Sequence, residues 1–213
     1  YGVSNGKKPA LAITIANREK ALLQDLDYEN GYSLYVGNSF LARASVCTAP
    51  LVLIRWNGGQ KRVDEYLDTL CKELTFIREQ MGTRKLTTVY IGGGTPTTLE
   101  PEQLRRLLSH IQETFDFTWV KEYTVEAGRP DSITREKLQV MKEFPVTRIS
   151  VNPQTMNQKT LDVIGRKHTV EDTVNIFHMA RELEFDNINM DLIIGLPGEG
   201  KEEVAHTLQE VEN

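Results

Sequence analysis

The segment TVYIGGGTPT, residues 88–97, decides the fold because it changes character within ten residues. Its first four residues are β-branched or aromatic, which is typical of a strand. Three glycines then allow a tight turn, and Pro96 stops further strand pairing. An amphipathic helical pattern over about Lys61–Met81 precedes this strand, and another over Glu102–Phe115 follows it. The sequence therefore predicts a strand over Thr87–Gly92 that leads through a glycine turn into a helix.

The same order of strand and helix recurs along the chain. Such alternation predicts an α/β fold with parallel strands and right-handed crossovers. Two layouts fit equally, an open doubly wound sheet and a partial β/α barrel. The other strands are expected at Ser33–Gly37, Glu122–Ala127, Val146–Asn152 and Asn187–Gly195, and the other helices at Thr134–Phe144, Lys159–Gly165, Val170–Leu183 and Lys201–Val211.

The composition excludes several classes of protein. The 213 residues include 25 Lys+Arg and 30 Asp+Glu, a formal net charge of -5 that argues against a general nucleic-acid binder. No apolar run approaches the roughly 18–20 residues of a membrane span. The first residues lack the apolar core of a signal peptide, so a cytoplasmic location is expected. Because the chain lacks an initiator Met and stops within a helical pattern, it is interpreted as an internal fragment.

Candidate functional residues follow the predicted strands. The turn of Gly93, Gly94 and Thr95 would let a ligand approach backbone amides, although a plain tight turn fits as well. Its spacing matches neither a P-loop nor a dinucleotide fingerprint. Glu126 ends one strand and Gln154 follows the next, where α/β enzymes bind ligands. A solvated strand end is the alternative for Glu126.

Two further residues carry charge at informative places. Asp191 lies inside an apolar strand pattern, so we expect a buried carboxylate with a partner. Arg166 lies in a basic turn between two helices, where it could bind a ligand carboxylate or only complement a helix end.

Five motifs together resemble one family. They are YIGGGTPTTL (90–99), VEAGRPD (125–131), RISVNPQTMN (148–157), IGRKHT (164–169) and NMDLIIGLPG (189–198). In this order they resemble oxygen-independent coproporphyrinogen III oxidases, in particular the coproporphyrinogen dehydrogenase branch, within the radical S-adenosylmethionine (SAM) superfamily. The resemblance implies a six-stranded partial barrel of which five strands are present. It also implies an N-terminal lead-in helix and linker over residues 1–30 and an incomplete core barrel over residues 31–213.

The resemblance implies a SAM site at one end of this barrel. Gly93, Gly94 and Thr95 match the motif that holds the methionine end of SAM. The other matching SAM contacts are Tyr35, Glu126, Gln154, Arg166 and Asp191.

The chain departs from the family in the loop that binds its 4Fe-4S cluster. The family pattern is C-x-x-x-C-x-x-C, but the corresponding residues are Leu41, Ser45 and Thr48, which supply no thiolate. Segment Leu41–Gln60 also has neither helical nor clean strand periodicity. We hypothesise that it is a frameshifted reading, because the codon junctions after these three residues permit cysteine in the neighbouring frame. The alternative is a truly diverged loop in a protein that has lost its cluster.

The implied activity is oxidative decarboxylation of coproporphyrinogen III propionates to vinyl groups through a 5′-deoxyadenosyl radical, with an electron donor such as flavodoxin or ferredoxin. Without cluster cysteines the chain as written is expected to be inactive. Relatives with the same motifs act as heme chaperones, and the motifs do not separate the two functions. A third interpretation is an inert fragment with a vestigial site. The expected partner is a porphyrinogen or heme-type small molecule, with no nucleic acid and no membrane span.

Overall fold

The computed structural model describes residues 12–14, 32–37, 60–83, 85–92 and 95–212. These residues form a six-stranded parallel sheet whose strand order is the order of the chain, β1 to β6. The strands are β1 (Ala12–Thr14), β2 (Tyr32–Gly37), β3 (Leu86–Gly92), β4 (Glu122–Glu126), β5 (Arg148–Ser150) and β6 (Ile188–Asn189).

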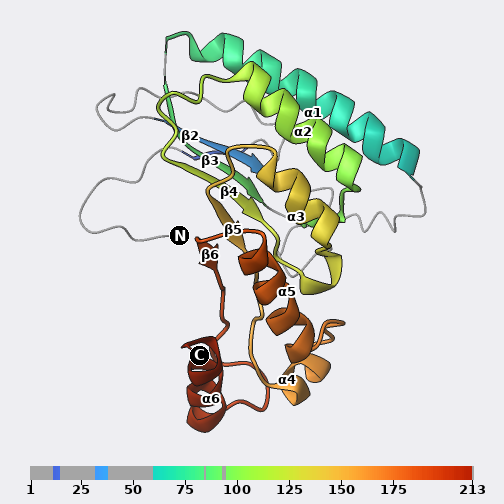
Figure 1. Ribbon diagram of the computed structural model, residues 1–213, viewed down its shortest axis with the longest axis vertical. Helices are drawn as coiled ribbons and strands as arrows, with labels where there is room; N and C mark the ends of the chain where they lie inside the picture. The colour runs from blue at the N-terminus through green and yellow to red at the C-terminus, as the bar shows by residue number, and fades with distance from the viewer. Residues whose placement is uncertain (1–11, 15–31, 38–59, 84, 93–94, 213) are drawn as a thin grey trace.

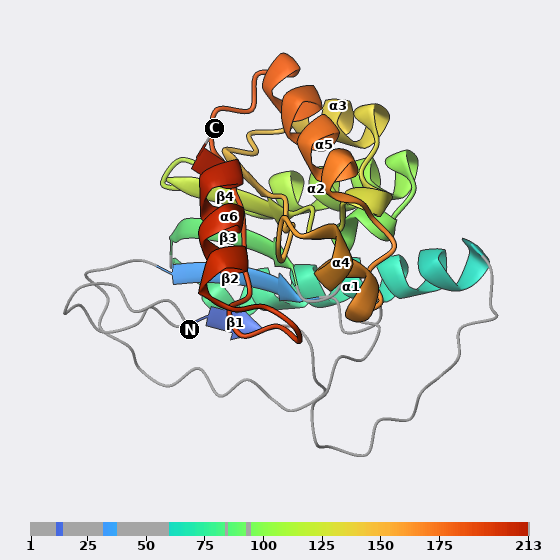
Figure 2. The ribbon, with the colours of Figure 1, turned by 90° about the horizontal axis from the view of Figure 1, so that it is seen from below.

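Helices follow the strands as the sequence predicts, within one or two residues at most boundaries. They are α1 (Gln60–Met81), α2 (Pro101–Thr114), α3 (Arg135–Lys142), α4 (Gln158–Val163), α5 (Val170–Glu182) and α6 (Lys201–Glu212), with short 3-10 turns η2 (Pro96–Thr98) and η3 (Pro130–Ser132). Figures 1 and 2 show α1, α2, α3 and α5 together on one side of the sheet, with α6 apart from them. None of the helices in the described part combines the length and the hydropathy that crossing a bilayer requires.

This arrangement separates the two layouts that the sequence left open. A doubly wound sheet reverses its strand order near the middle and carries helices on both faces. Here the order runs without reversal, and the four helices pack on the same face. The partial barrel is therefore confirmed.

The core lies between that helix layer and the sheet. Leu67 and Leu74 of α1 and Leu107 and Ile111 of α2 are at most 1% exposed. They belong to one buried cluster with alternate residues of β3, β4 and β5, namely Val89, Ile91, Tyr123, Val125 and Ile149. Burial of these side chains holds the helix layer against one face of the sheet. The alternate residues of the same strands lie on the opposite face.

Two expectations about strands were wrong. The count of five is one too low, because β1 lies in the segment for which a lead-in helix and linker are expected. The three residues of β1 are too few to show the alternating pattern of a strand in the sequence. The last strand, expected over Asn187–Gly195, ends at Asn189, and Leu192 makes only an isolated bridge to Gln154. The remainder of residues 1–30 lies outside the described residues, and the proposed domain division stays a prediction.

Candidate functional site

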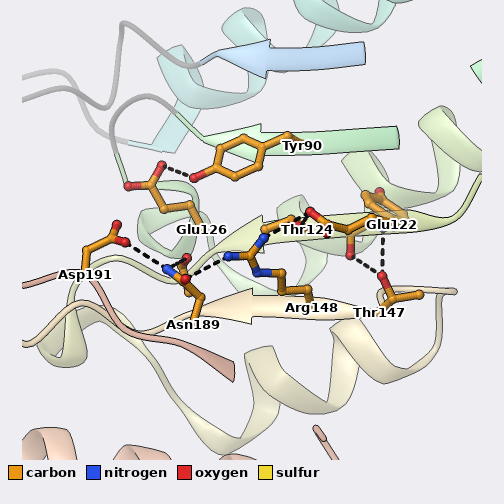
Figure 3. Close-up of polar contacts among 10 residues, drawn as sticks. Tyr90, Glu122, Thr124, Glu126, Thr147, Arg148, Asn189 and Asp191 are labelled. Carbon is orange, nitrogen blue, oxygen red and sulfur yellow. Dashed lines mark hydrogen bonds and ion pairs between the residues drawn. The ribbon is translucent and has the colours of Figure 1, made fainter. Parts of the chain in front are cut away.

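The face of the sheet opposite the helices is lined by polar side chains at every second strand position. In-register pairing of Glu126 with Ser150, and of Ser150 with Asn189, places these three on the same face at the carboxyl end. Figure 3 shows the polar side chains meeting across β3 to β6. The polar positions are Thr88 and Tyr90 of β3, Glu122, Thr124 and Glu126 of β4, Arg148 and Ser150 of β5, and Asn189 of β6.

Glu126, the last residue of β4, lies between two glycines and a tyrosine. The Tyr90 hydroxyl lies 3.5 Å from its Oε2 atom. A Cβ atom placed on Gly92 would lie 2.5 Å from Oε2, and one placed on Gly128 would lie 3.1 Å from Oε1. A side chain at position 92 would therefore force the Glu126 carboxylate to move, whereas one at position 128 would need only a shift of a few tenths of an ångström.

Strand β3 ends at Gly92, beside this carboxylate. Gly93 and Gly94 lie outside the described residues. Thr95, next in the chain, is buried, and its carbonyl oxygen accepts hydrogen bonds from the backbone N and the hydroxyl of Thr98 at 2.9 and 2.8 Å. These bonds begin η2 and fix the exit of the turn.

A buried lysine ties this exit to the next strand–helix connection. Lys137 Nζ donates to the carbonyl oxygens of Thr97 and Ser132, at 2.6 and 3.1 Å. The hydroxyls of Thr97 and Ser132 lie 2.6 Å apart. Burial lowers the pKa of Lys137 below its ordinary value. The Lys137 side chain therefore joins η2 and η3 through these two hydrogen bonds.

Three of the predicted site residues lie together at the carboxyl end of β5 and β6. The backbone N of Gln154 donates to the carbonyl oxygen of Asp191 at 3.2 Å. Arg166 Nη2 donates to Oε1 of Gln154 at 3.0 Å. Gln154 has φ 71°, a left-handed conformation that is rare for a residue other than glycine. Because such strain often accompanies function, it marks Gln154 as a site candidate.

Arg166 supplies a positive charge at the candidate site. Burial, followed by the positive charge of Arg129, lowers the pKa of Arg166 below its usual range, while the negative charge of Asp131 acts in the opposite direction. An arginine remains charged in spite of such a shift. The guanidinium of Arg166 can therefore bind a carboxylate or a similar anion.

The expected burial of Asp191 was wrong. Its side chain is exposed, because the chain has left the sheet after Asn189. It does have a partner, since Asn189 Nδ2 donates to its Oδ1 at 2.8 Å. Its backbone N donates to Oδ1 of Asn152 at 3.3 Å. Asp191 is therefore held at the rim of the sheet.

Other predicted positions are only partly described. The backbone of Tyr35 in β2 pairs in register with Tyr90 in β3, and its side chain is not among the described parts of the structure. Leu41, Ser45 and Thr48 lie outside the described residues, so the frameshift hypothesis stays a prediction.

Sequence reasoning missed Asn152, Asn189 and Arg148 as site residues. A signal was available, since RISVN at 148–152 alternates polar and apolar residues. A period of two places the polar members on one face of a strand. Applied to every strand, that pattern would have found the polar face.

The comparisons with known proteins agree on one family. The family model described as "Radical SAM superfamily" matches residues 55–211. The chain is 42% identical over 211 residues to the oxygen-independent coproporphyrinogen-III oxidase-like protein HemZ of Bacillus subtilis, covering 97% of the chain and 42% of that protein. It is 40% identical over 147 residues to the heme chaperone HemW of Bacillus subtilis, covering 68% of the chain and 38% of that protein.

A solved structure gives the same result. Coproporphyrinogen III oxidase HemN from Escherichia coli, described as a radical SAM enzyme, superimposes with a TM-score of 0.68 at 26% identity. The match covers 85% of this chain and 41% of that one. The chain thus spans about two fifths of the length of these relatives.

Proposed function

The chain belongs to the radical SAM superfamily, and from this premise we propose that it forms the SAM-binding part of an oxygen-independent coproporphyrinogen III oxidase-like protein. The observation that carries the proposal is the gathering of Gln154, Arg166 and Asp191 at the sheet end to which Glu126 also belongs. The proposed small-molecule partner is a porphyrinogen or heme-type compound, as the names of the relatives suggest.

The residues present fit the polar groups of SAM. SAM carries an ammonium, a carboxylate and two ribose hydroxyls. Arg166 suits the carboxylate, and the carboxylates of Glu126 and Asp191 suit the ammonium and the hydroxyls. Glycine at 92 and 128 leaves room beside Glu126 that a Cβ atom would fill. When bound, SAM supplies the adenosyl group of the family's radical chemistry.

The residues present do not fit a 4Fe-4S cluster held by three thiolates. The whole chain has two cysteines. Cys71 lies buried in α1, where burial raises the pKa of its thiol and disfavours the thiolate that iron requires. Among the described residues, no group of three or more His, Cys, Asp or Glu side chains could hold a metal ion. The sequence as written therefore supports no reaction step through a cluster.

SAM binding is the direct test. Equilibrium dialysis of the protein with radiolabelled SAM is expected to show saturable binding, and Glu126→Gln and Arg166→Gln are each expected to raise Kd at least about tenfold. Loss of a charged contact of this kind costs about 1.5–3 kcal/mol. Arg135→Gln removes an exposed ion pair with Glu182 on the outer helices and serves as the matched control. Absence of saturable binding by the unsubstituted protein would contradict the proposal.

A heme chaperone is the second candidate function, favoured by the 40% identity to HemW. A hemin titration followed by the shift of the Soret band measures heme binding. Anaerobic incubation with coproporphyrinogen III, SAM and an electron donor such as flavodoxin or ferredoxin measures conversion to protoporphyrinogen. Stoichiometric heme binding would favour the chaperone, and conversion would favour the oxidase. Because the sequence as written has only two cysteines, lack of conversion by itself favours neither function.

A further inference from the structure

We infer that Arg148 and Asn189 are positioning residues that hold the carboxylate of Asp191 toward the cofactor, an inference that rests on the proposed SAM site. The basis is a continuous run of side-chain hydrogen bonds across β4, β5 and β6 to the rim of the sheet (Figure 3).

The run begins at an ion pair on the polar face. Arg148 Nη1 lies 3.2 Å from Oε1 of Glu122, and this oxygen also accepts a hydrogen bond from the Thr124 hydroxyl at 2.8 Å. Arg148 Nη2 donates to Oδ1 of Asn189 at 2.7 Å. The guanidinium is thus fixed between an acid on one neighbouring strand and an amide on the other.

The hydrogen bond from Arg148 fixes the orientation of the Asn189 side-chain amide. The oxygen and nitrogen of an asparagine side chain have nearly the same shape, so packing alone does not choose between two orientations. A guanidinium only donates, so the oxygen of Asn189 must face Arg148. The nitrogen then donates to the hydroxyl of Ser150 at 3.0 Å and to Oδ1 of Asp191 at 2.8 Å.

The result is a carboxylate with one oxygen fixed and one left for a ligand. Asp191 is exposed, and its Oδ2 accepts no hydrogen bond from the described residues. Its backbone is fixed on both sides, through Asn152 and Gln154. A ligand hydroxyl that reaches Oδ2 therefore meets an acceptor whose position is already set, which lowers the entropy cost of binding.

A double-mutant cycle with SAM binding as the readout tests the inference. Asn189→Asp keeps the shape of the side chain and an oxygen for Arg148, but it replaces the donor that faces Asp191 with a like charge. We expect Asn189→Asp to raise the Kd for SAM at least tenfold, and Asp191→Asn to raise it as well. Because Asn189 acts through Asp191, the double variant is expected to bind no more weakly than Asp191→Asn alone.

Arg148 is tested by graded variants. Arg148→Met removes both donors and frees the Asn189 amide to turn, so we expect Kd to rise about threefold to tenfold. Arg148→Lys retains one donor and is expected to recover part of that loss. Thermal melting of each variant, together with the Arg135→Gln control, separates loss of folding from loss of positioning.

The outcomes separate this inference from the proposed function. An unchanged Kd in Asn189→Asp, with SAM binding by the unsubstituted protein, overturns the inference and leaves the proposed function standing. Multiplying effects in the double variant indicate a packing role and also overturn the inference. Absence of SAM binding by the unsubstituted protein overturns the proposed function, and this inference with it.

Discussion

Gly92 offers a direct test of whether the position of Glu126 matters. A Cβ atom at Gly92 would lie 2.3 Å from Cε1 of Tyr90 and 2.5 Å from Oε2 of Glu126, whereas ordinary van der Waals contact begins near 3.4 Å. Gly92→Ala therefore requires a displacement of about 1 Å. The neighbours that can move are the ends of the Tyr90 and Glu126 side chains, so the substitution acts on the candidate site itself.

The size of the effect follows from this displacement. Extra volume in a packed site costs about 1–3 kcal/mol, which corresponds to roughly 5- to 160-fold in a dissociation constant when the cost falls on the bound state. We expect the Kd for SAM, measured by equilibrium dialysis, to rise about 10- to 100-fold in Gly92→Ala. Gly128→Ala brings its Cβ only to 3.1 Å from Oε1 of Glu126 and is expected to raise Kd less than about threefold.

A control at Gly82 separates site effects from general loss of stability. Gly82 has φ 58°, and no atom lies within 4 Å of its Cβ position. Gly82→Ala is expected to destabilise the fold by about 1 kcal/mol through backbone strain, with no change in the Kd for SAM. If Gly92→Ala folds and binds SAM as tightly as the unsubstituted protein, Glu126 does not contact the cofactor and the reasoning is refuted.

Three further predictions concern stability and metal content. The Tyr123 hydroxyl is buried without a hydrogen-bond partner among the described residues. Tyr123→Phe is therefore expected to stabilise the fold by about 1 kcal/mol and to raise Tm by about 2–4 °C. A lower Tm in this variant would contradict the prediction. Burial lowers the pKa of His168, so the folded state resists the proton that the unfolded chain takes up below about pH 6.5. The free energy of unfolding therefore falls as the pH drops below that value, by at most about 1.4 kcal/mol per pH unit. Urea titrations at pH 5–8 are expected to show a weaker pH dependence of this free energy in His168→Gln than in the unsubstituted protein. Anaerobic reconstitution with iron and sulfide is expected to leave the chain without a cluster, and about four irons per chain would contradict that. Resequencing the DNA from the codon of Gly37 to that of Lys61 tests the frameshift hypothesis separately.

Elements with a strong period were predictable, and short or exposed ones were not. The amphipathic pattern predicts α1 almost to the residue, and Thr134 caps α3 as expected, accepting from the backbone N of Lys137. Strand β1, with three residues, carries too little pattern to detect. The apolar run from Leu192 to Leu196 suggests a strand, yet Ile193 and Ile194 are 42% and 80% exposed. Composition alone does not report whether an apolar residue is buried.

The rim of the site was predictable because the ends of parallel strands must share one edge. That rule leads to Glu126 and Gln154 without knowledge of any distance. Asp191 was singled out for its place in an apolar run, and its expected burial was wrong. The roles of Arg148 and Asn189 were not predictable in this way, because they are 41 residues apart in sequence and meet only through strand register.

The agreement of strand order with chain order has a consequence for how the molecule is assembled. Each strand pairs with the strand made just before it, so every new unit finds its partner already present during synthesis. No later segment has to insert between two earlier ones. A sheet of this kind can gain or lose a terminal unit without rearranging the remaining pairs, which makes stepwise shortening from either end a natural way to find the smallest version that still folds.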